Sequence, residues 1–149
     1  MKAMAPIRPT ELHQCRIRIP ATPIAAAQAR DEVSEAIAAW AIKVDRDDAV
    51  LLTSELVTNA FVHGGTGDIL LTIGCCHCEL RVDVHDTSAS LPVLASAAPD
   101  SENGRGLMIV DFLADQWGYY RTPTGKSVFF VMTFLPELPL AGQPGLLGI

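Results

Sequence analysis

The hydrophobic and polar positions of this chain follow two periods, which separate helical segments from strand-like ones. In the Ala-rich segment that opens with Thr22-Pro23, apolar residues recur every three or four positions, as on one face of a helix. Thr22 is suited to cap a helix and Pro23 to its first position, so we predict a helix from here to about Ile42. A second helix should begin near Asp45, whose carboxylate can cap it, and end before Gly64-Gly65.

Other segments alternate between polar and apolar residues or carry a strand-like apolar run. The first is Cys15–Ile19, which Pro20 stops, and this predicts an edge strand. Four more predicted strands are Ile69–Ile73, Leu80–Val84, Trp117–Arg121 and Ser127–Phe134. Short turns within Cys76–Glu79 and Pro123–Gly125 predict two antiparallel hairpins, and a third helix is expected from about Arg105 to Asp115.

Helices that alternate with hairpin-connected strands predict an α/β (α+β) two-layer sandwich. We expect one sheet, mixed or mostly antiparallel, with the helices on one face and the other face open or carrying a partner. This domain should cover residues 15–135, with flexible arms at 1–14 and 136–149. Residues 87–103 lack a clear period and form a loop long enough to be functional.

Length and charge narrow the possible functions. A chain of 149 residues with 49% hydrophobic content is sufficient for one domain with one packed core. Its net charge of −6 disfavours a nucleic-acid partner, because a polyanion would meet a repulsive field. No secretory leader pattern is visible, and no apolar run approaches the ~20 residues needed to cross a bilayer. We therefore expect a soluble cytoplasmic protein with no membrane partner.

Four cysteines, at positions 15, 75, 76 and 78, leave two readings open. The cluster Cys75-Cys76-His77-Cys78 contains soft metal ligands, but a structural zinc site usually joins two separated pairs, and only Cys15 could complete one. The other reading is a hairpin turn with reduced thiols, some of them packed as small apolar residues. We favour the hairpin turn.

The predicted second helix carries a polar stripe of Glu55, Asn59 and His63, spaced so that the three share one face. An exposed polar face is the ordinary explanation of such a stripe. A second explanation is chemical: an amide oxygen of Asn59 can bind Mg²⁺, and a Glu55 carboxylate can accept a proton from a hydroxyl or water. The stripe alone does not decide between them.

Asp86 and the segment Gly104–Gly106 each allow a structural and a functional interpretation. Asp86 ends a predicted strand, where Asp often begins a turn, but its carboxylate could accept a hydrogen bond from the amino group of adenine. Gly104-Arg105-Gly106 is either a loop-to-helix junction or a place where backbone N–H groups meet phosphate. Ile109 replaces the third glycine of a dinucleotide-binding motif, which disfavours that site.

Other nucleotide and hydrolase motifs are excluded. Gly125-Lys126-Ser127 resembles the end of a P-loop, but Tyr120 stands where its first glycine should be and a strand follows instead of a helix. The sequence contains neither a Gly-x-Ser-x-Gly motif nor a Ser–His–Asp arrangement, so it does not indicate an acyl-transfer enzyme.

Taken in order, the motifs resemble the boxes of the Bergerat-fold ATPases, the superfamily of gyrase, histidine kinases and mismatch-repair ATPases. The matching segments are Glu55–Ala60 (N-box), Asp86 with Pro92 (G1 box), Gly104-Arg105-Gly106-Leu107 (G2 box) and the strand Gly125–Phe129. In its short length and in the sequence segments Gly106–Asp111 and Ala114–Gly118, the chain is similar to the small bacterial anti-sigma-factor serine/threonine kinases. The resemblance covers about residues 15–135.

The resemblance implies ATP and Mg²⁺ as cofactors and assigns roles to the matching residues. Glu55 would be the general base or orient the attacking hydroxyl, Asn59 would hold Mg²⁺, and Asp86 would read adenine. Gly104 and Gly106 would wrap the phosphates, and residues 91–103 would form a lid. The other expected nucleotide-site residues are His63, Ser88, Pro92, Arg105, Leu107, Lys126 and Ser127. At Ser88 the chain departs from the usual Asp-x-Gly of the superfamily.

The leading hypothesis is an anti-sigma kinase that binds a sigma factor and phosphorylates an anti-anti-sigma (STAS-like) partner. A non-catalytic ATP-binding interaction module of the same fold is the main alternative. Ser88 favours this module, whereas Glu55 favours the enzyme. A zinc-dependent regulator that uses the cysteine cluster is a third. The sequence leaves open whether the chain is a homodimer.

Overall fold

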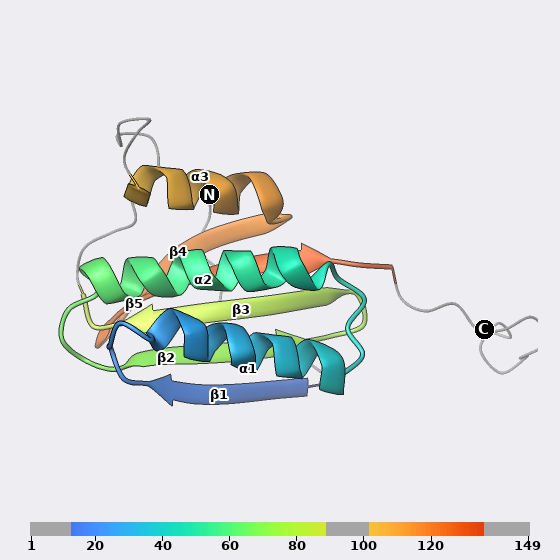
Figure 1. Cartoon of the computed structure of the whole chain (residues 1–149), viewed down its shortest axis with the longest axis horizontal. Helices are drawn as coiled ribbons and strands as arrows, with labels where there is room; N and C mark the ends of the chain where they lie inside the picture. The colour runs from blue at the N-terminus through green and yellow to red at the C-terminus, as the bar shows by residue number, and fades with distance from the viewer. Residues whose placement is uncertain (1–12, 89–101, 136–149) are drawn as a thin grey trace, which may run out of the picture.

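A computed structural model describes residues 13–88 and 102–135, with the backbone alone for 102–107. Eight elements are found in this part of the chain (Figure 1). In chain order they are β1 (His13–Ile19), α1 (Ala25–Ala39), α2 (Arg46–His63), β2 (Ile69–Cys75), β3 (Glu79–Asp86), α3 (Glu102–Leu113), β4 (Gln116–Thr122) and β5 (Gly125–Thr133). The described part of the chain has no helix that is both long enough and apolar enough to span a membrane.

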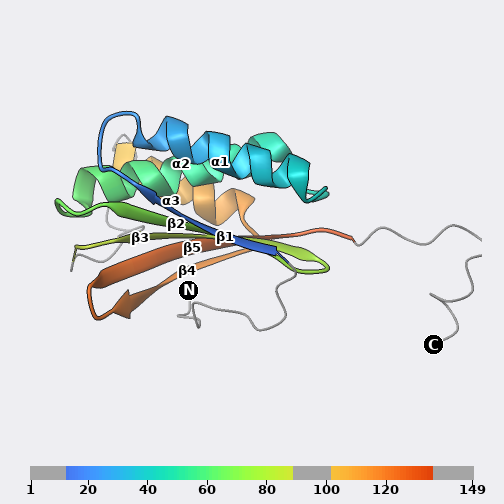
Figure 2. The same ribbon diagram turned by 90° about the horizontal axis from the view of Figure 1, so that it is seen from below.

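The five strands form one sheet in the order β1-β2-β3-β5-β4, and every neighbouring pair is antiparallel. The helices all lie on one face of this sheet, as Figure 2 shows. The predicted two-layer α/β sandwich, its two hairpins and the edge position of β1 are confirmed. The strand β1 begins at His13, two residues before the predicted start at Cys15. The remainder of the predicted arm 1–14 and the tail 136–149 lie outside the described residues.

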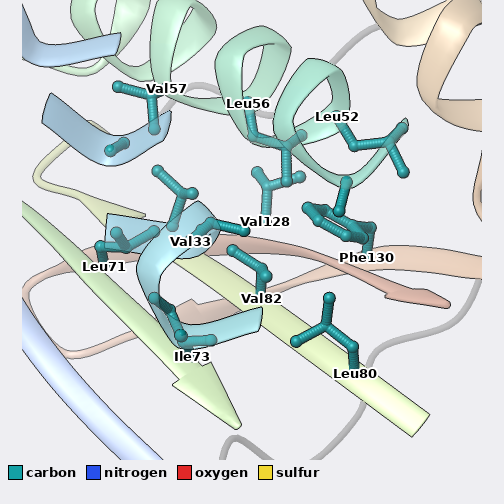
Figure 3. Packing of buried hydrophobic residues seen from close by; sticks show 14 of the residues in the cluster. Val33, Leu52, Leu56, Val57, Leu71, Ile73, Leu80, Val82, Val128 and Phe130 are labelled. Atoms are coloured by element: carbon teal, nitrogen blue, oxygen red, sulfur yellow. The ribbon is translucent and has the colours of Figure 1, made fainter. Parts of the chain in front are cut away.

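The core lies between the sheet and the helices, where alternate strand residues meet the apolar face of α2 (Figure 3). On β3 these residues are Leu80, Val82 and Val84, and each is at most 1% exposed. Their cross-strand partners on β5 are Met132, Phe130 and Val128, on the same face. Residues between them on either strand must therefore point to the opposite, helix-free face.

The start of α1 differs from the prediction. The helix begins at Ala25, its N-cap is Ile24, and no side chain caps it. Thr22 instead lies in a backbone turn, where its N–H donates to Pro20 and its carbonyl accepts from Ala25. The predictions that Thr22 caps this helix and that Pro23 is its first residue are wrong, because the helix begins two residues later, at Ala25. For α2 the predicted cap is confirmed: Asp45 accepts from the Asp48 N–H at 2.9 Å.

The end of α1 is a Schellman motif without glycine. Ile42 N–H donates to Ile37 O at 3.0 Å and Ala41 N–H to Ala38 O at 3.3 Å, the two bonds that define the motif. Ala41 has a φ of 53°, in the left-handed region. The helix therefore ends at Ala39, earlier than the predicted Ile42.

The helix-free face carries a polar cluster of buried Arg81 and Asp83 with half-buried Tyr120, beside Phe129. Arg81 Nε donates to Asp83 Oδ1 at 2.8 Å, and the Tyr120 hydroxyl donates to Asp83 Oδ2 at 2.8 Å. The Arg81 guanidinium lies 4.2 Å from the centre of the Phe129 ring. Burial and the Asp83 charge raise the pKa of Tyr120 to about 12. These contacts pair the charges of Arg81 and Asp83 on a face that no described helix covers.

Replacement of Ala41 by glycine should stabilise the protein. Glycine adopts a positive φ without the steric cost that alanine incurs, although it also loses more chain entropy on folding. We expect Ala41→Gly to raise the free energy of unfolding by about 0.5–1 kcal/mol, measured by urea denaturation. Ala38→Gly, at an exposed position inside the same helix, is the control and should cost up to about 1 kcal/mol. A destabilised Ala41→Gly would contradict the Schellman assignment.

Stability should fall in mild acid because of His85, which lies on the helix-free face with Nε2 2.8 Å from Thr122 Oγ1. Burial lowers the pKa of His85 below 6.5; the Asp86 charge opposes this and the Lys126 charge adds to it. The unfolded chain therefore binds the proton first as the pH falls through about 6.5, and stability is lost until the folded pKa is reached.

The pKa of His85 can be measured by NMR titration of its ring protons, with unfolding measured in parallel. We expect a midpoint below 6.5, and we expect His85→Gln to remove this component of the pH dependence. A midpoint at or above 6.5 would refute the assignment.

Candidate functional site

Several chain segments that the sequence analysis singled out end or begin at the same end of the molecule (Figure 1). The ends of α2 and β3 meet there, since Thr87 N–H donates to Gly64 O at 3.1 Å. The first residues of β5 pair with the last residues of β3. The first turn of α3 also lies at this end, and α3 packs along α2. The fold thus brings together the segments expected to bind the nucleotide.

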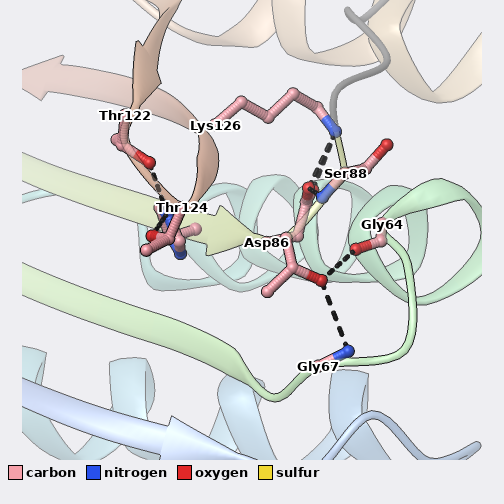
Figure 4. A network of polar contacts seen from close by, with 9 residues as sticks. Gly64, Gly67, Asp86, Ser88, Thr122, Thr124 and Lys126 are labelled. Atoms are coloured by element: carbon pink, nitrogen blue, oxygen red, sulfur yellow. Dashed lines mark hydrogen bonds and ion pairs between the residues drawn. The ribbon is translucent and has the colours of Figure 1, made fainter.

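Asp86 and Lys126 form a buried ion pair at the centre of this region (Figure 4). They are direct cross-strand partners, and Lys126 Nζ lies 2.9 Å from both Asp86 Oδ1 and Oδ2. The backbone N–H of Ser88 also donates to Oδ1, at 2.9 Å. The side chains are only 3% (Asp86) and 6% (Lys126) exposed, so each charge depends on the other for its stabilisation.

Close backbone packing fixes the end of β3. Thr87 Oγ1 donates to Gly64 O at 3.2 Å and accepts from Gly67 N–H at 3.3 Å (Figure 4). A Cβ at Gly64 would collide with Ala60 O and Asp86 Cβ, and one at Gly125 would collide with Asp86 O. Glycine at positions 64 and 125 therefore allows the α2 end and the β5 start to close around Asp86.

The polar stripe of α2 lies along one edge of that helix. The opposite edge carries Ser54, whose Oγ accepts a hydrogen bond from Arg30 of α1 at 3.0 Å. Because each helical residue is rotated by about 100°, Glu55 and Asn59 lie on the edge away from α1, where α3 packs. Both are half-buried, whereas His63 is exposed in the last turn. The stripe therefore ends at His63, the last residue of α2, next to Gly64.

The segment Gly104-Arg105-Gly106-Leu107 lies within α3 rather than at its first residue. The helix begins at Glu102, about three residues earlier than predicted, so Gly104 is in the first turn. The first four N–H groups of a helix have no partner within it and can face an anion. The Arg105 and Leu107 side chains are outside the described part of the structure. Pro92 and most of the expected lid (residues 91–103) are outside it too.

Ser127 lies away from the ion pair. It is adjacent to Lys126 on β5, so its side chain points to the helix-free face, where it pairs across with His85 and Tyr120. Ser127 was expected in the nucleotide site because it belongs to the same sequence motif as Lys126. Strand alternation separates them, and we therefore leave Ser127 out of the site proposed below.

The cysteine cluster forms the β2–β3 hairpin turn. Cys75 is buried at the end of β2, Cys76 N–H donates to Glu79 O at 3.0 Å, and Cys78 is exposed. All four cysteines are free thiols. Over the described ranges, no three His, Cys, Asp or Glu side chains come together as a metal site.

Sequence reasoning missed the Asp86–Lys126 ion pair, although a signal for it was present. Asp86 continues the core-facing alternation of Val82 and Val84, and Lys126 that of Val128 and Phe130. A charged residue in phase with the apolar face of each of two strands requires a partner, because an unpaired buried charge is very costly. Only the strand pairing identifies the two as partners.

Comparison with known proteins agrees with this architecture. The crystal structure of the RsbU and RsbW domains of Rv1364c from Mycobacterium tuberculosis matches with a TM-score of 0.61 and 21% identity, over 85% of this chain. The present chain spans 33% of that protein's chain. No curated protein matches this chain. The profile of the histidine kinase-like ATPase domain matches residues 19–132. The chain therefore belongs to the histidine kinase-like ATPase domain family.

Proposed function

We propose that this chain is an ATP-binding anti-sigma factor that acts as a serine/threonine kinase on an anti-anti-sigma, STAS-like partner. The observation that carries the proposal is the buried Asp86 carboxylate at the end of β3, in a histidine kinase-like ATPase fold. It lies next to the Gly64 end of α2, the helix that carries Glu55 and Asn59. The RsbW domain of the similar structure supports the anti-sigma part. The kinase would work in the cytoplasm and release or hold its sigma factor as partners exchange.

In this proposal the adenine ring is read by Asp86. The Oδ2 atom of Asp86 accepts one hydrogen bond in the described structure, from Lys126, and a carboxylate oxygen can accept two. Adenine offers an amino donor at the position where guanine offers a carbonyl acceptor. A buried acceptor in this place favours ATP or ADP over GTP.

The phosphates would lie toward the first turn of α3 and the edge of α2. The first backbone N–H groups of α3 have no partner within the helix, so they favour a negative charge at this position. The donor chemistry fits Mg²⁺, since Asn59 offers an amide oxygen, a hard ligand that this cation accepts. Mg²⁺ supplies neutralisation of phosphate charge when it is bound. Glu55 lies one helical turn from Asn59 and would orient the seryl hydroxyl of the partner and accept its proton.

The second candidate is a non-catalytic ATP-binding interaction module of the same fold. Ser88 favours this module, because it stands two residues after Asp86, at a position where glycine is usual in the superfamily. Its N–H donates a hydrogen bond to Asp86 Oδ1. A side chain at this position restricts the backbone angles available to the following segment. The module would bind nucleotide and partner without transferring phosphate.

The base preference can be measured by calorimetric titration with ATP and GTP. We expect tighter binding of ATP, and a loss of tenfold or more in ATP affinity for Asp86→Asn, because a hydrogen bond to a charged group contributes about 1.5–3 kcal/mol. Asp68→Asn is the matched control, since it removes the same charge from an exposed position in the α2–β2 loop. Equal affinity of the unmodified chain for ATP and GTP would refute the assignment of Asp86.

Two variants of α2 separate the kinase from the module. Glu55→Ala should leave ATP binding largely intact and abolish phosphate transfer to the serine partner. Asn59→Ala should also remove the Mg²⁺ dependence of ATP binding, because its amide oxygen is the proposed ligand. Binding with and without Mg²⁺ and transfer of labelled phosphate measure the two defects.

Thr58→Ala is the control for both variants, since Thr58 is exposed on α2 between the two positions. It should change neither measurement and should alter stability by less than about 0.5 kcal/mol. A chain that binds ATP but transfers no phosphate to any candidate partner would favour the module. An unaltered transfer rate in Glu55→Ala would exclude Glu55 as the base.

A further inference from the structure

Lys126 has no chemical role in the function proposed above, yet it is the residue most closely bound to the proposed adenine reader. Its ammonium group contacts both oxygens of Asp86 and is almost fully buried with it. We propose that Lys126 is a second base-reading residue, which donates a hydrogen bond to N1 of adenine while Asp86 accepts one from the 6-amino group. This inference rests on the proposed ATP-binding function.

A count of donors and acceptors shows that the pair has capacity for a base. A carboxylate offers about four acceptor positions, of which Lys126 and the Ser88 N–H occupy three, two on Oδ1 and one on Oδ2. An ammonium group has three N–H donors, and two are directed to Asp86. Among the described residues, one acceptor position on Oδ2 and one donor on Nζ therefore remain, on atoms 2.9 Å apart.

This remaining acceptor and donor match the edge of adenine. Adenine presents its amino donor next to the N1 acceptor, so Asp86 and Lys126 together complement both positions. Guanine presents a carbonyl acceptor next to an N1–H donor, the reverse order. A carboxylate alone reads only the amino group, whereas the pair also requires an acceptor at N1. Lys126 would thus extend the recognition of the base from one atom to two.

The position of Lys126 supports this role over a purely structural one. An Asp that ends a strand and only closes a turn needs no buried cation, and a buried pair contributes little to stability compared with apolar residues of similar size. The pair adjoins Ser88 and the Gly64 end of α2, at the end of the molecule where the nucleotide segments meet. In this low-dielectric location hydrogen bonds from charged groups are strong. Because both side chains are nearly covered, a base must displace the atoms over them on entry.

The test compares ATP with two analogues, one changed at ring atom N1 and one without the 6-amino group. Calorimetric titration of the full chain would use ATP, 1-deaza-ATP, which has C–H in place of N1, and purine riboside triphosphate, which lacks the 6-amino group. We expect the unmodified chain to bind 1-deaza-ATP about tenfold or more weakly than ATP, as the loss of a charge-assisted hydrogen bond implies. This comparison needs no variant and is independent of folding defects.

The variant Lys126→Met assigns the effect to the lysine. It should bind ATP about as weakly as the unmodified chain binds 1-deaza-ATP, should no longer distinguish those two nucleotides, and should still prefer both over purine riboside triphosphate. Lys43→Met is the matched control, because Lys43 is exposed in the α1–α2 connection and its removal changes the net charge equally. It should retain the unmodified selectivity. Thermal unfolding of each variant shows whether it is folded.

Equal affinity of the unmodified chain for ATP and 1-deaza-ATP would overturn the role of Lys126 while leaving ATP binding in place. Tighter ATP binding by Lys126→Met would also overturn it, because it would show that the lysine competes with adenine for Asp86. Failure of the unmodified chain to bind any of the three nucleotides would overturn the proposed function itself. The two failures are therefore distinguishable.

Discussion

The antiparallel pairing of β3 with β5 is the contact on which the site depends. These two central strands carry core-facing residues in the same phase, Val84 opposite Val128 and Val82 opposite Phe130. The same register places Asp86 opposite Lys126 at the end of the pair. A slip of one residue would turn every core residue to the other face and would also separate the two charges. Burial of the apolar residues thus fixes the geometry of the polar ones.

The two faces of β3 carry different kinds of polar group. On the helix side, the Asp86–Lys126 ion pair lies at the end of the strand where α2 terminates. On the helix-free side, Arg81 and Asp83 form a separate salt bridge, in which Asp83 also accepts a hydrogen bond from Tyr120 and Arg81 lies over the Phe129 ring. The second cluster is held by partners from neighbouring strands, and the sequence motifs contribute to it through Phe129, the last residue of the motif on β5. The first lies between motifs from three elements, which is why we assign recognition to it.

Close approach of the backbone at glycine positions gives the site its shape. Gly64 and Gly125 belong to different turns, yet a side chain at either would collide with atoms of Ala60 or Asp86. The end of α2, the end of β3 and the start of β5 are consequently held together independently of any ligand.

The sequence by itself determined the elements and their class. Periodicity identified the helices and strands, because a residue's neighbours along the chain decide which face it can bury. The Asp45 cap, the end of α2 before Gly64 and the hairpin at the cysteine cluster followed from local chemistry. The ordered motifs indicated the ATPase family, which the match over residues 19–132 confirms.

Only the tertiary structure decided which side chains meet. The order of strands places β5 between β3 and β4, so Lys126 reaches Asp86 from forty residues away. Strand alternation sends Ser127 to the other face, although it is the next residue of the same motif. These outcomes depend on pairing between distant segments, and such contacts leave little local signal in a single sequence.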